Sequence, residues 1–191
     1  METNAGVTGL NYQRMKSVFF PHTSFTDIEL EMDRIDGLRV FSSMCSMIFE
    51  RDITLANGGF VLDTPAPTGL CGADFAKAML FDIACAVKRS HDVLMDISPN
   101  DKEIVYGCGF KGHIFPQMVA DLLGKQVVLR QGFTQSSILG CVQLCNRNFD
   151  LPPFSVAESR AFTPCPDGRY AEYYDKCETM RLNVDAAYNL R

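Results

Sequence analysis

Residues 103–129, EIVYGCGFKGHIFPQMVADLLGKQVVL, decide the fold of this chain. A short apolar strand at 103–106 leads into a glycine-rich turn at 107–112. Apolar residues then recur at helical spacing through 114–123, and 126–129 predicts the next strand. Strand, helix and strand in this order are typical of a crossover between parallel strands. The sequence therefore predicts an α/β fold.

The neighbouring segments extend this unit on both sides. Gly124 is placed to end the first helix. After the second strand, Thr134 opens another helix whose apolar residues share one side: Ile138, Leu139, Val142 and Cys145. Upstream, Asp74–Met95 predicts a helix that is apolar on nearly all sides and is therefore buried. Asp82 lies inside it, and we expect its carboxylate to bond a neighbouring group, because an unpaired buried charge costs too much.

The remaining segments carry weaker patterns. Apolar spacing at 26–36 fits a short helix, and 38–41 predicts a strand after a turn dipeptide. Residues 51–72 are loop-like, apart from a strand candidate at 60–62. Prolines interrupt the region from 151 onward. A last helix is predicted after them, with tyrosines that begin at Tyr170.

We divide the chain into three parts. Residues 1–36 form an N-terminal segment that could begin the same domain, 37–150 form the main domain, and 151–191 form a C-terminal tail with the closing helix. This division is a prediction from composition and pattern alone.

Composition and charge exclude several classes of protein. The 191 residues carry a net charge of -5, and 47% of them are hydrophobic, which is enough for a core without disulfides or metals. The acidic balance argues against a nucleic-acid partner. No apolar stretch approaches the roughly 20 residues of a membrane span. Met1 to Asn4 show neither a basic region nor an apolar core, so we expect no signal peptide and a cytoplasmic location.

The cysteines and histidines give no metal or catalytic site. Without an export signal, the eight cysteines are expected to be small buried hydrophobes rather than a disulfide framework. Cys141 and Cys145 lie one helical turn apart, but two thiols alone make a poor zinc site. His22, His91 and His113 are scattered along the chain. We therefore predict no metal site and assign no catalytic residue.

The glycine turn is the best candidate for a binding site. Glycines let a backbone approach a phosphate or a flat ring closely, and the following helix offers free N–H groups to an anion. Lys111 could add a charge, and His113 could cap the helix. The candidate nucleotide-binding residues are Gly107, Cys108, Gly109, Phe110, Lys111 and Gly112. The same pattern also fits a tight strand-to-helix turn without a ligand.

Two common nucleotide motifs do not fit this turn. A dinucleotide-binding unit needs an acid at the end of the second strand, where this chain has Leu129-Arg130-Gln131. A Walker A loop closes with Gly-Lys-Ser/Thr, which is absent here. A small Rossmann-like nucleotide binder is therefore the weakest interpretation.

Several segments resemble, in order, the C-terminal domain of the FGGY family of carbohydrate kinases. Gly37–Phe41 resembles the family's Gly-Leu strand, and 49–53 takes the place of its Gly-Glu-Arg-x-Pro loop. Asn57–Phe60 is similar to the Arg-Gly-x-Phe that follows. Residues 74–80 are similar to the signature His-Leu-x-Arg-Ala-x-Leu-Glu-Gly. The resemblance covers most of 37–180.

The glycine segment resembles the family most closely. The family has Gly-Gly-Gly, a helix with Trp-x-Gln-x-x-Ala-Asp, and then Gly-x-Pro-Val. The matching residues here are Gly107-Cys108-Gly109, Phe115, Gln117, Ala120-Asp121 and Gly124–Val127. Leu139-Gly140 match the family's Glu-x-x-Ala-Leu-Gly-Ala, with Gln135 in place of the Glu. Phe162, Pro164 and 170–174 resemble its closing Phe-x-Pro and tyrosine-rich helix.

The resemblance implies the fold and the ligands. The fold would be an actin-like, ribonuclease-H-like ATPase domain, a mixed sheet with packed helices, present as the C-terminal lobe only. Residues 107–112 would face ATP, with Gly112 near the adenine, and Mg²⁺ would serve in the complete enzyme. Two departures affect this site: Cys108 replaces a glycine, and Phe110 and Gly112 replace small polar residues or Asn.

The resemblance also implies a function. The chain would be the nucleotide-binding lobe of an ATP-dependent sugar or polyol kinase. The family's Asp-x-Gly-Thr phosphate loop and general-base Asp have no counterpart here. We therefore expect the sugar to bind only together with an N-terminal lobe, and the chain alone to be inactive. The alternative is a non-catalytic remnant, or an interaction domain that pairs with a separate N-terminal lobe. A partner chain or a homo-oligomer is expected in that case.

Overall fold

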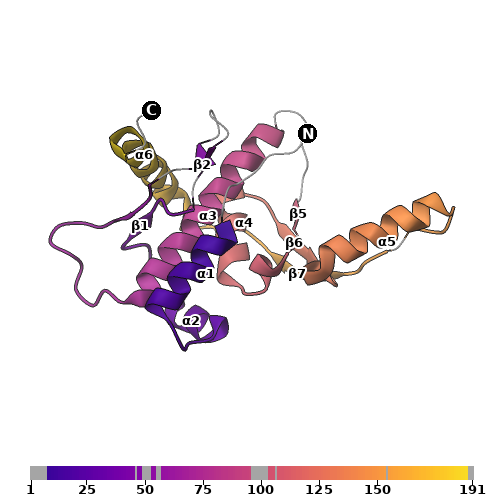
Figure 1. Ribbon diagram of the computed structural model, residues 1–191, viewed down its shortest axis with the longest axis horizontal. Coiled ribbons are helices and arrows are strands. Elements are labelled where there is room, and N and C mark those ends of the chain that lie inside the picture. Colours follow the sequence, from indigo (N-terminus) through magenta and orange to yellow (C-terminus); the bar gives the residue numbers. More distant parts are fainter. Residues whose placement is uncertain are drawn as a thin grey trace.

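The computed structural model describes residues 8–45, 47–48, 53–54, 57–95, 103–105, 107–153 and 155–188. Figure 1 shows a body of helices, a small sheet at its side, and one helix that projects away from both. The mixed α/β architecture agrees with the fold class expected from the sequence.

The helical body is built around α3 (Gly72–Met95), which is the longest helix described. The elements that pack against it are α1 (Thr8–Phe19), α2 (Phe25–Met32), α4 (Ile114–Leu123), α6 (Ala171–Tyr188) and β1 (Phe41–Ser42). Ala78, Met79 and Phe81 are almost fully buried and lie on different sides of the helix. The prediction of a helix buried all round is therefore confirmed.

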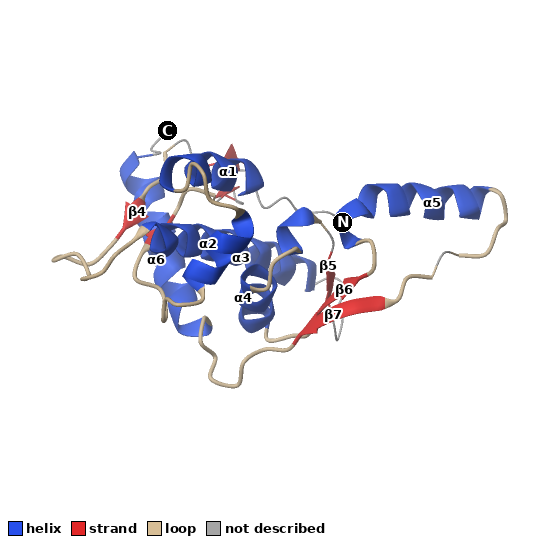
Figure 2. Cartoon of the chain, turned by 90° about the horizontal axis from the view of Figure 1, so that it is seen from below, coloured by secondary structure: helices blue, strands red, loops and turns tan. Residues whose placement is uncertain are grey.

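The sheet beside the body contains the predicted crossover. β5 (Glu103–Val105) and β6 (Val127–Arg130) are parallel neighbours, and α4 connects them. Gly124 ends α4 with a φ of 63°, a conformation that glycine adopts without strain. β7 (Glu158–Phe162) pairs antiparallel with the other edge of β6, as Figure 2 shows. The parallel unit expected from 103–129 is thus confirmed, and the tail adds a strand to it.

Two antiparallel pairs complete the strands described. β1 pairs with β4 (Phe60–Val61), and β2 (Met47–Ile48) pairs with β3 (Ile53–Thr54). The strand expected at 38–41 was placed too early, because Arg39 turns toward α3 and binds Asp74 instead of extending the pairing. Part of the region expected to be a loop is the strand β3. Residues 49–52 and 55–56 lie outside the described residues.

The sequence pattern missed α1 and β7. α1 mixes polar and apolar residues, and it is held by Tyr12, Met15 and Phe19, which pack against the core. β7 reads ESRAF, and its side chains are exposed or half-buried. A strand with so little apolar alternation gives no period-2 signal.

The expectation about the cysteines needs correction. Cys45, Cys85 and Cys177 are buried as expected, but Cys71, Cys141 and Cys145 are exposed. The last two lie on α5 (Ser136–Asn148), a helix that contains no buried residue. The apolar side that the spacing predicted for this helix therefore faces solvent. No helix among the described residues has the length and apolar character needed to cross a bilayer.

Asp82 ties α3 to β1. Its side chain is fully buried, and Oδ2 accepts hydrogen bonds from the Cys45 backbone N–H at 2.8 Å and from Ser42 Oγ at 3.3 Å. Burial, with a smaller contribution from the Asp82 carboxylate, raises the pKa of the Cys45 thiol well above its usual range. The expectation that Asp82 bonds neighbouring groups is confirmed.

Replacing Asp82 by alanine should lower the free energy of unfolding by about 1–3 kcal/mol, because the Cys45 N–H would stay buried without its acceptor. Urea unfolding followed by circular dichroism measures the change. Asp92→Ala is the control, because Asp92 is half-exposed and pairs with Lys88 and His91 on the same helix. Its loss should cost less than about 0.5 kcal/mol. Equal effects of the two substitutions would contradict the structural role of Asp82.

Candidate functional site

The glycine turn lies where the carboxyl ends of β5 and β6 meet. Gly107 has a φ of 115°, which favours glycine, and a Cβ placed there would meet no atom within 4 Å. Its N–H donates to the Phe133 carbonyl at 2.8 Å, so the turn after β5 is joined to the turn after β6. In open α/β sheets, ligands bind outside the carboxyl ends of the strands. The turn occupies that position.

The turn continues as a single turn of 3₁₀ helix, Cys108–Phe110. The Phe110 N–H donates to the Gly107 carbonyl at 3.2 Å. The Phe110 ring packs against Phe115 with ring centres 4.9 Å apart, so one side of this ring is supported by α4. Gly109 and Lys111 are exposed. The turn thus presents open backbone, a partly exposed ring and one cation.

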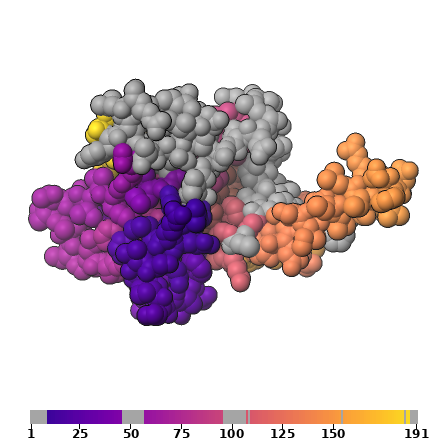
Figure 3. Space-filling model, viewed as in Figure 1, coloured from indigo at the N-terminus to yellow at the C-terminus, as the bar shows by residue number. Residues whose placement is uncertain are grey.

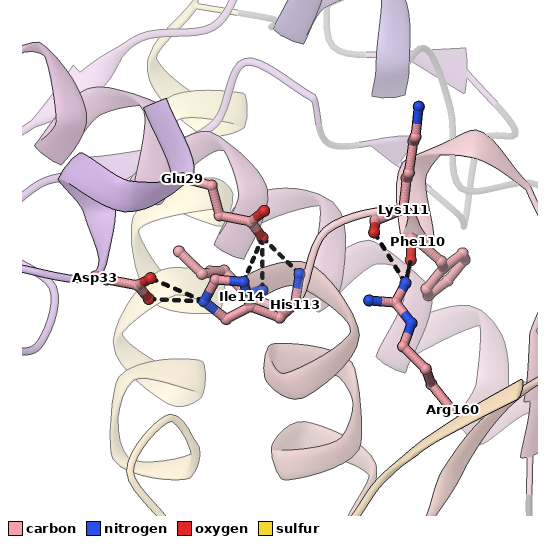
Figure 4. A network of polar contacts seen from close by, with 7 residues as sticks. All are labelled: Glu29, Asp33, Phe110, Lys111, His113, Ile114 and Arg160. Carbon is pink, nitrogen blue, oxygen red and sulfur yellow. Dashed lines mark hydrogen bonds and ion pairs between the residues drawn. The ribbon is translucent and has the colours of Figure 1, made fainter. Parts of the chain in front are cut away.

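Arg160 holds the end of the turn from β7. Its Nη2 donates to the Phe110 carbonyl at 3.0 Å and to the Lys111 carbonyl at 2.9 Å. The guanidinium also lies over the rings of Phe133 and Phe162, at 5.8 and 5.5 Å from their centres. Figure 4 shows this side chain reaching the turn. Arg160 could not be identified from the sequence, because the two carbonyls that it binds lie 49 and 50 residues away and β7 was not predicted.

A carboxylate of this chain occupies the N-terminus of α4. Glu29 Oε1, from α2, accepts hydrogen bonds from the backbone N–H groups of His113 at 2.6 Å and Ile114 at 2.9 Å. His113 Nε2 lies 2.9 Å from both carboxylate oxygens of Asp33, as Figure 4 shows. A Cβ on Gly112 would overlap the Glu29 carboxylate, so a larger residue there would displace Glu29 from the start of α4.

Two expectations about this helix end are therefore wrong. Its first N–H groups are not available to an external anion, because Glu29 already accepts from them. The His113 side chain makes no capping hydrogen bond, and it pairs with Asp33 instead. The positive end of the α4 dipole is neutralised from within the chain.

Gln117 and Asp121 of α4 form hydrogen bonds with the segment that follows β7. Asp121 Oδ1 accepts from Gln117 Nε2 at 2.8 Å and from the Cys165 N–H at 2.7 Å. Gln117 Nε2 also donates to the Thr163 carbonyl at 2.9 Å. These contacts hold the segment after β7 against α4, so both residues act in folding.

The described part of the chain brings together no group of three or more His, Cys, Asp or Glu side chains that could hold a metal ion. The carboxylates of Glu29 and Asp33, at the end of the turn, bind backbone N–H groups and the His113 side chain.

Comparison with known proteins finds sugar kinases. The chain is 33% identical over 168 residues to YoaC of Bacillus subtilis (strain 168), a protein assigned as a sugar kinase. The match covers 86% of this chain and 34% of YoaC. The chain thus spans about a third of the length of this curated relative. No family model matches the chain.

Solved structures give the fold. A ligand-bound xylulose kinase from Lactobacillus acidophilus matches with a TM-score of 0.76 at 15% identity, over 95% of this chain and 39% of that protein. A xylulose kinase from Rhodospirillum rubrum matches with a TM-score of 0.70 at 18% identity, over 97% and 39%. A glycerol kinase of Plasmodium falciparum with ADP matches with a TM-score of 0.61 at 15% identity, over 98% and 38%.

The fold is that of one lobe of an actin-like ATPase, which confirms the fold class expected from the sequence. More particularly, the chain is similar in sequence to about a third of YoaC and in fold to part of the xylulose kinases. The three-part division of the chain stays a prediction.

Replacing Glu29 by alanine should lower the free energy of unfolding by about 1–2 kcal/mol, because two N–H groups at the start of α4 lose their acceptor. Glu29→Gln keeps an acceptor and should lose less, about 0.3–1 kcal/mol from the missing charge at the helix end. Urea unfolding measures both. Glu31→Ala, an exposed site on the same helix, is the control. If alanine at 29 behaved like alanine at 31, the proposed role of Glu29 would be wrong.

Replacing Arg160 by methionine should loosen the turn while keeping the apolar stem of the side chain. Amide hydrogen exchange at 107–112 should become about tenfold faster, which corresponds to the loss of one to two net hydrogen bonds. Arg169→Met is the control, because the Arg169 side chain is 54% exposed and pairs only with neighbouring Asp167. Unchanged amide exchange at 107–112 in Arg160→Met would show that the turn keeps its conformation without Arg160.

Proposed function

We propose that this chain is the nucleotide-binding lobe of an ATP-dependent carbohydrate kinase. In the complete two-lobed enzyme it serves phosphoryl transfer to a hydroxyl of a sugar or polyol. The observation that carries the proposal is the open glycine turn at the carboxyl ends of β5 and β6, in a fold shared with sugar kinases.

In this proposal, the residues of the turn have separate tasks. Gly107 and Gly109 let the backbone come close to the nucleotide. The partly exposed ring of Phe110 offers a flat apolar surface, and the Lys111 ammonium offers charge to a phosphate. Arg160 keeps the turn in shape without using its own charge on the ligand. Cys108 and Gly112 complete the candidate set, with Gly112 serving to admit Glu29.

Glu29 directs where the phosphates lie. Its carboxylate at the start of α4 repels an anion from the helix end and leaves Gly107–Lys111 as the place for phosphate contact. Phosphoryl transfer needs in-line positioning and neutralisation of charge, and Mg²⁺ supplies part of that neutralisation when bound with ATP. Its ligands would be the phosphates themselves and groups of the other lobe.

The sugar and the catalytic base belong to a second lobe in this proposal. The chain alone is therefore inactive, and it works in the cytoplasm either as part of a longer polypeptide or with a partner chain. The acid-free turn suits a nucleotide, but it offers no general base for a sugar hydroxyl.

A second candidate function rests on the same geometry. Glu29 fills a position that an anion would otherwise use, and Cys108 stands in place of a glycine. Both features suit a lobe that has lost nucleotide binding and acts as an interaction domain. ATP affinity separates the two candidates.

Calorimetric titration of the chain with ATP–Mg²⁺ should give a dissociation constant of about 1 mM or tighter. Gly109→Ala should weaken binding about tenfold by blocking close approach, whereas the fold should tolerate the added Cβ, whose nearest neighbour would be the Phe115 ring at 4.0 Å. Gly9→Ala, on α1 in open space, is the control. No binding by the unaltered chain would favour the interaction domain.

A coupled assay with pentuloses and polyols tests the inactivity of the isolated chain. We expect no turnover above background, because the described turn supplies no base. Sugar-dependent ADP release by the purified chain would overturn this part of the proposal and leave nucleotide binding untouched.

A further inference from the structure

We propose that Cys85 and Cys177 form a site of reversible oxidation, at which a disulfide bond joins α6 to α3. The oxidant is a low-molecular-weight disulfide, for which oxidised glutathione is the probe. The inference concerns the helical body alone. It does not depend on nucleotide binding, so a failure of the proposed function would leave it standing.

Contacts between α3 and α6 fix the register of the two helices. Near the start of α6, the rings of Phe81 and Tyr173 meet with their centres 6.5 Å apart. Further along both helices, Arg89 Nη1 forms an ion pair with Glu178 Oε1, and these side chains are 12% and 18% exposed. The contacts occur in the same order on both helices, so the helices run in the same direction here. The turn of α3 between Phe81 and Arg89 is therefore packed against α6.

Cys85 and Cys177 meet within this contact. Cys85 is fully buried on α3, and Cys177 is 2% exposed on α6. Both are free thiols, and their side chains form a hydrogen bond with each other. The two sulfur atoms are therefore neighbours across the helix contact. A disulfide forms only between cysteines whose backbones are close and whose side chains point toward each other, and this pair faces in that way.

Burial protects the pair while α6 is in place. A thiol attacks a disulfide as the thiolate. Burial raises the pKa of the Cys85 thiol well above its usual range, and the hydrogen bond with Cys177 adds to the shift. A glutathione molecule also has no access to either sulfur in the closed contact. The pair therefore becomes reactive only when α6 moves away from α3.

α6 is suited to such an opening. Among the side chains that the structure describes on this helix, only Cys177 and Arg181 are buried. Elements with few buried contacts open locally at a low free energy. Figure 3 shows α1 and α2 covering the front of α3, and most of α6 is hidden behind them in this view. α6 can therefore open while α1 and α2 stay packed on α3.

Two thiol–disulfide exchange steps complete the oxidation. With α6 open, the Cys177 thiolate attacks one sulfur of oxidised glutathione, and a glutathione thiolate leaves. The attached glutathione keeps α6 from closing fully, so the Cys85 thiol stays accessible. The Cys85 thiolate then attacks the Cys177 sulfur and releases the second glutathione. The chain loses two electrons and two protons and gains one S–S bond, and oxidised glutathione becomes two glutathione thiols.

Peptide mapping of the chain after equilibration with oxidised and reduced glutathione tests the proposal. Free thiols are blocked with N-ethylmaleimide before digestion with trypsin. Trypsin releases peptides 78–88 and 177–181, each of which holds a single cysteine. We expect these two peptides joined in one product, two hydrogen atoms lighter than their sum. If Cys145 carried glutathione while Cys85 and Cys177 stayed unjoined, the proposal would be overturned.

The need for α6 to open gives a kinetic readout. Cys85 and Cys177 should react with N-ethylmaleimide at least about tenfold more slowly than Cys145, which is exposed on α5. Urea below the unfolding transition should speed the joining of Cys85 to Cys177 and leave the reaction of Cys145 unchanged. Equal reaction rates for the three cysteines in native buffer would contradict a protected pair and overturn the proposal.

The melting temperature reports what the disulfide does to the fold. The oxidised chain should melt several degrees higher than the reduced chain, because the bond closes a loop of about 90 residues, and dithiothreitol should reverse the rise. Cys177→Ala should abolish the rise, whereas Cys145→Ala, the matched control, should keep it. If Cys177→Ala did not fold, the peptide map of the unaltered chain would decide. An equal rise in Cys177→Ala would show that another pair is responsible and would overturn the proposal.

Discussion

The structure depends on the burial of α3. A 24-residue helix that is apolar on nearly every side must be covered on every side, and four helices and β1 meet that requirement. Its buried polar groups then decide how the covering elements sit. Asp74 binds Arg39 through two hydrogen bonds of 2.7 and 2.8 Å, and Lys77 donates to the Ile35 carbonyl at 2.6 Å. Each hydrogen bond compensates for the burial of a polar group on α3. Each also fixes the position of the packed segment along the helix.

The same body determines the electrostatics of the candidate site. α2 packs on α3, and this packing brings Glu29 to the start of α4, 84 residues further along the chain. The carboxylate neutralises a helix end that would otherwise attract phosphate. The positive charge left for an anion is then the Lys111 ammonium on the exposed turn. In the proposed function, the place of anion contact would therefore depend on the packing of α2 on α3, which the glycine pattern alone does not specify.

Local patterns were sufficient for the crossover unit. The period of 114–123, the stop at Gly124 and the apolar strands on either side are properties of consecutive residues, and the structure confirms them. Asp82 could also be anticipated, because a buried carboxylate requires partners whatever the fold. Glu29 and Arg160 could not be anticipated. Their roles come from contacts over 84 and about 50 residues, and neither lies in a motif. The spacing on α5 predicted which side is apolar but not what covers that side.

The glycine turn and the segment that leads into α5 lie at the same edge of the sheet. The bond from the Gly107 N–H to the Phe133 carbonyl joins the loop that would hold the nucleotide to the loop from which α5 leaves. Phosphoryl transfer requires the nucleotide and the acceptor hydroxyl to be held in line. In the proposed function, a change in the position of α5 would therefore act on the glycine turn through this bond, because the segments that follow β5 and β6 are joined there.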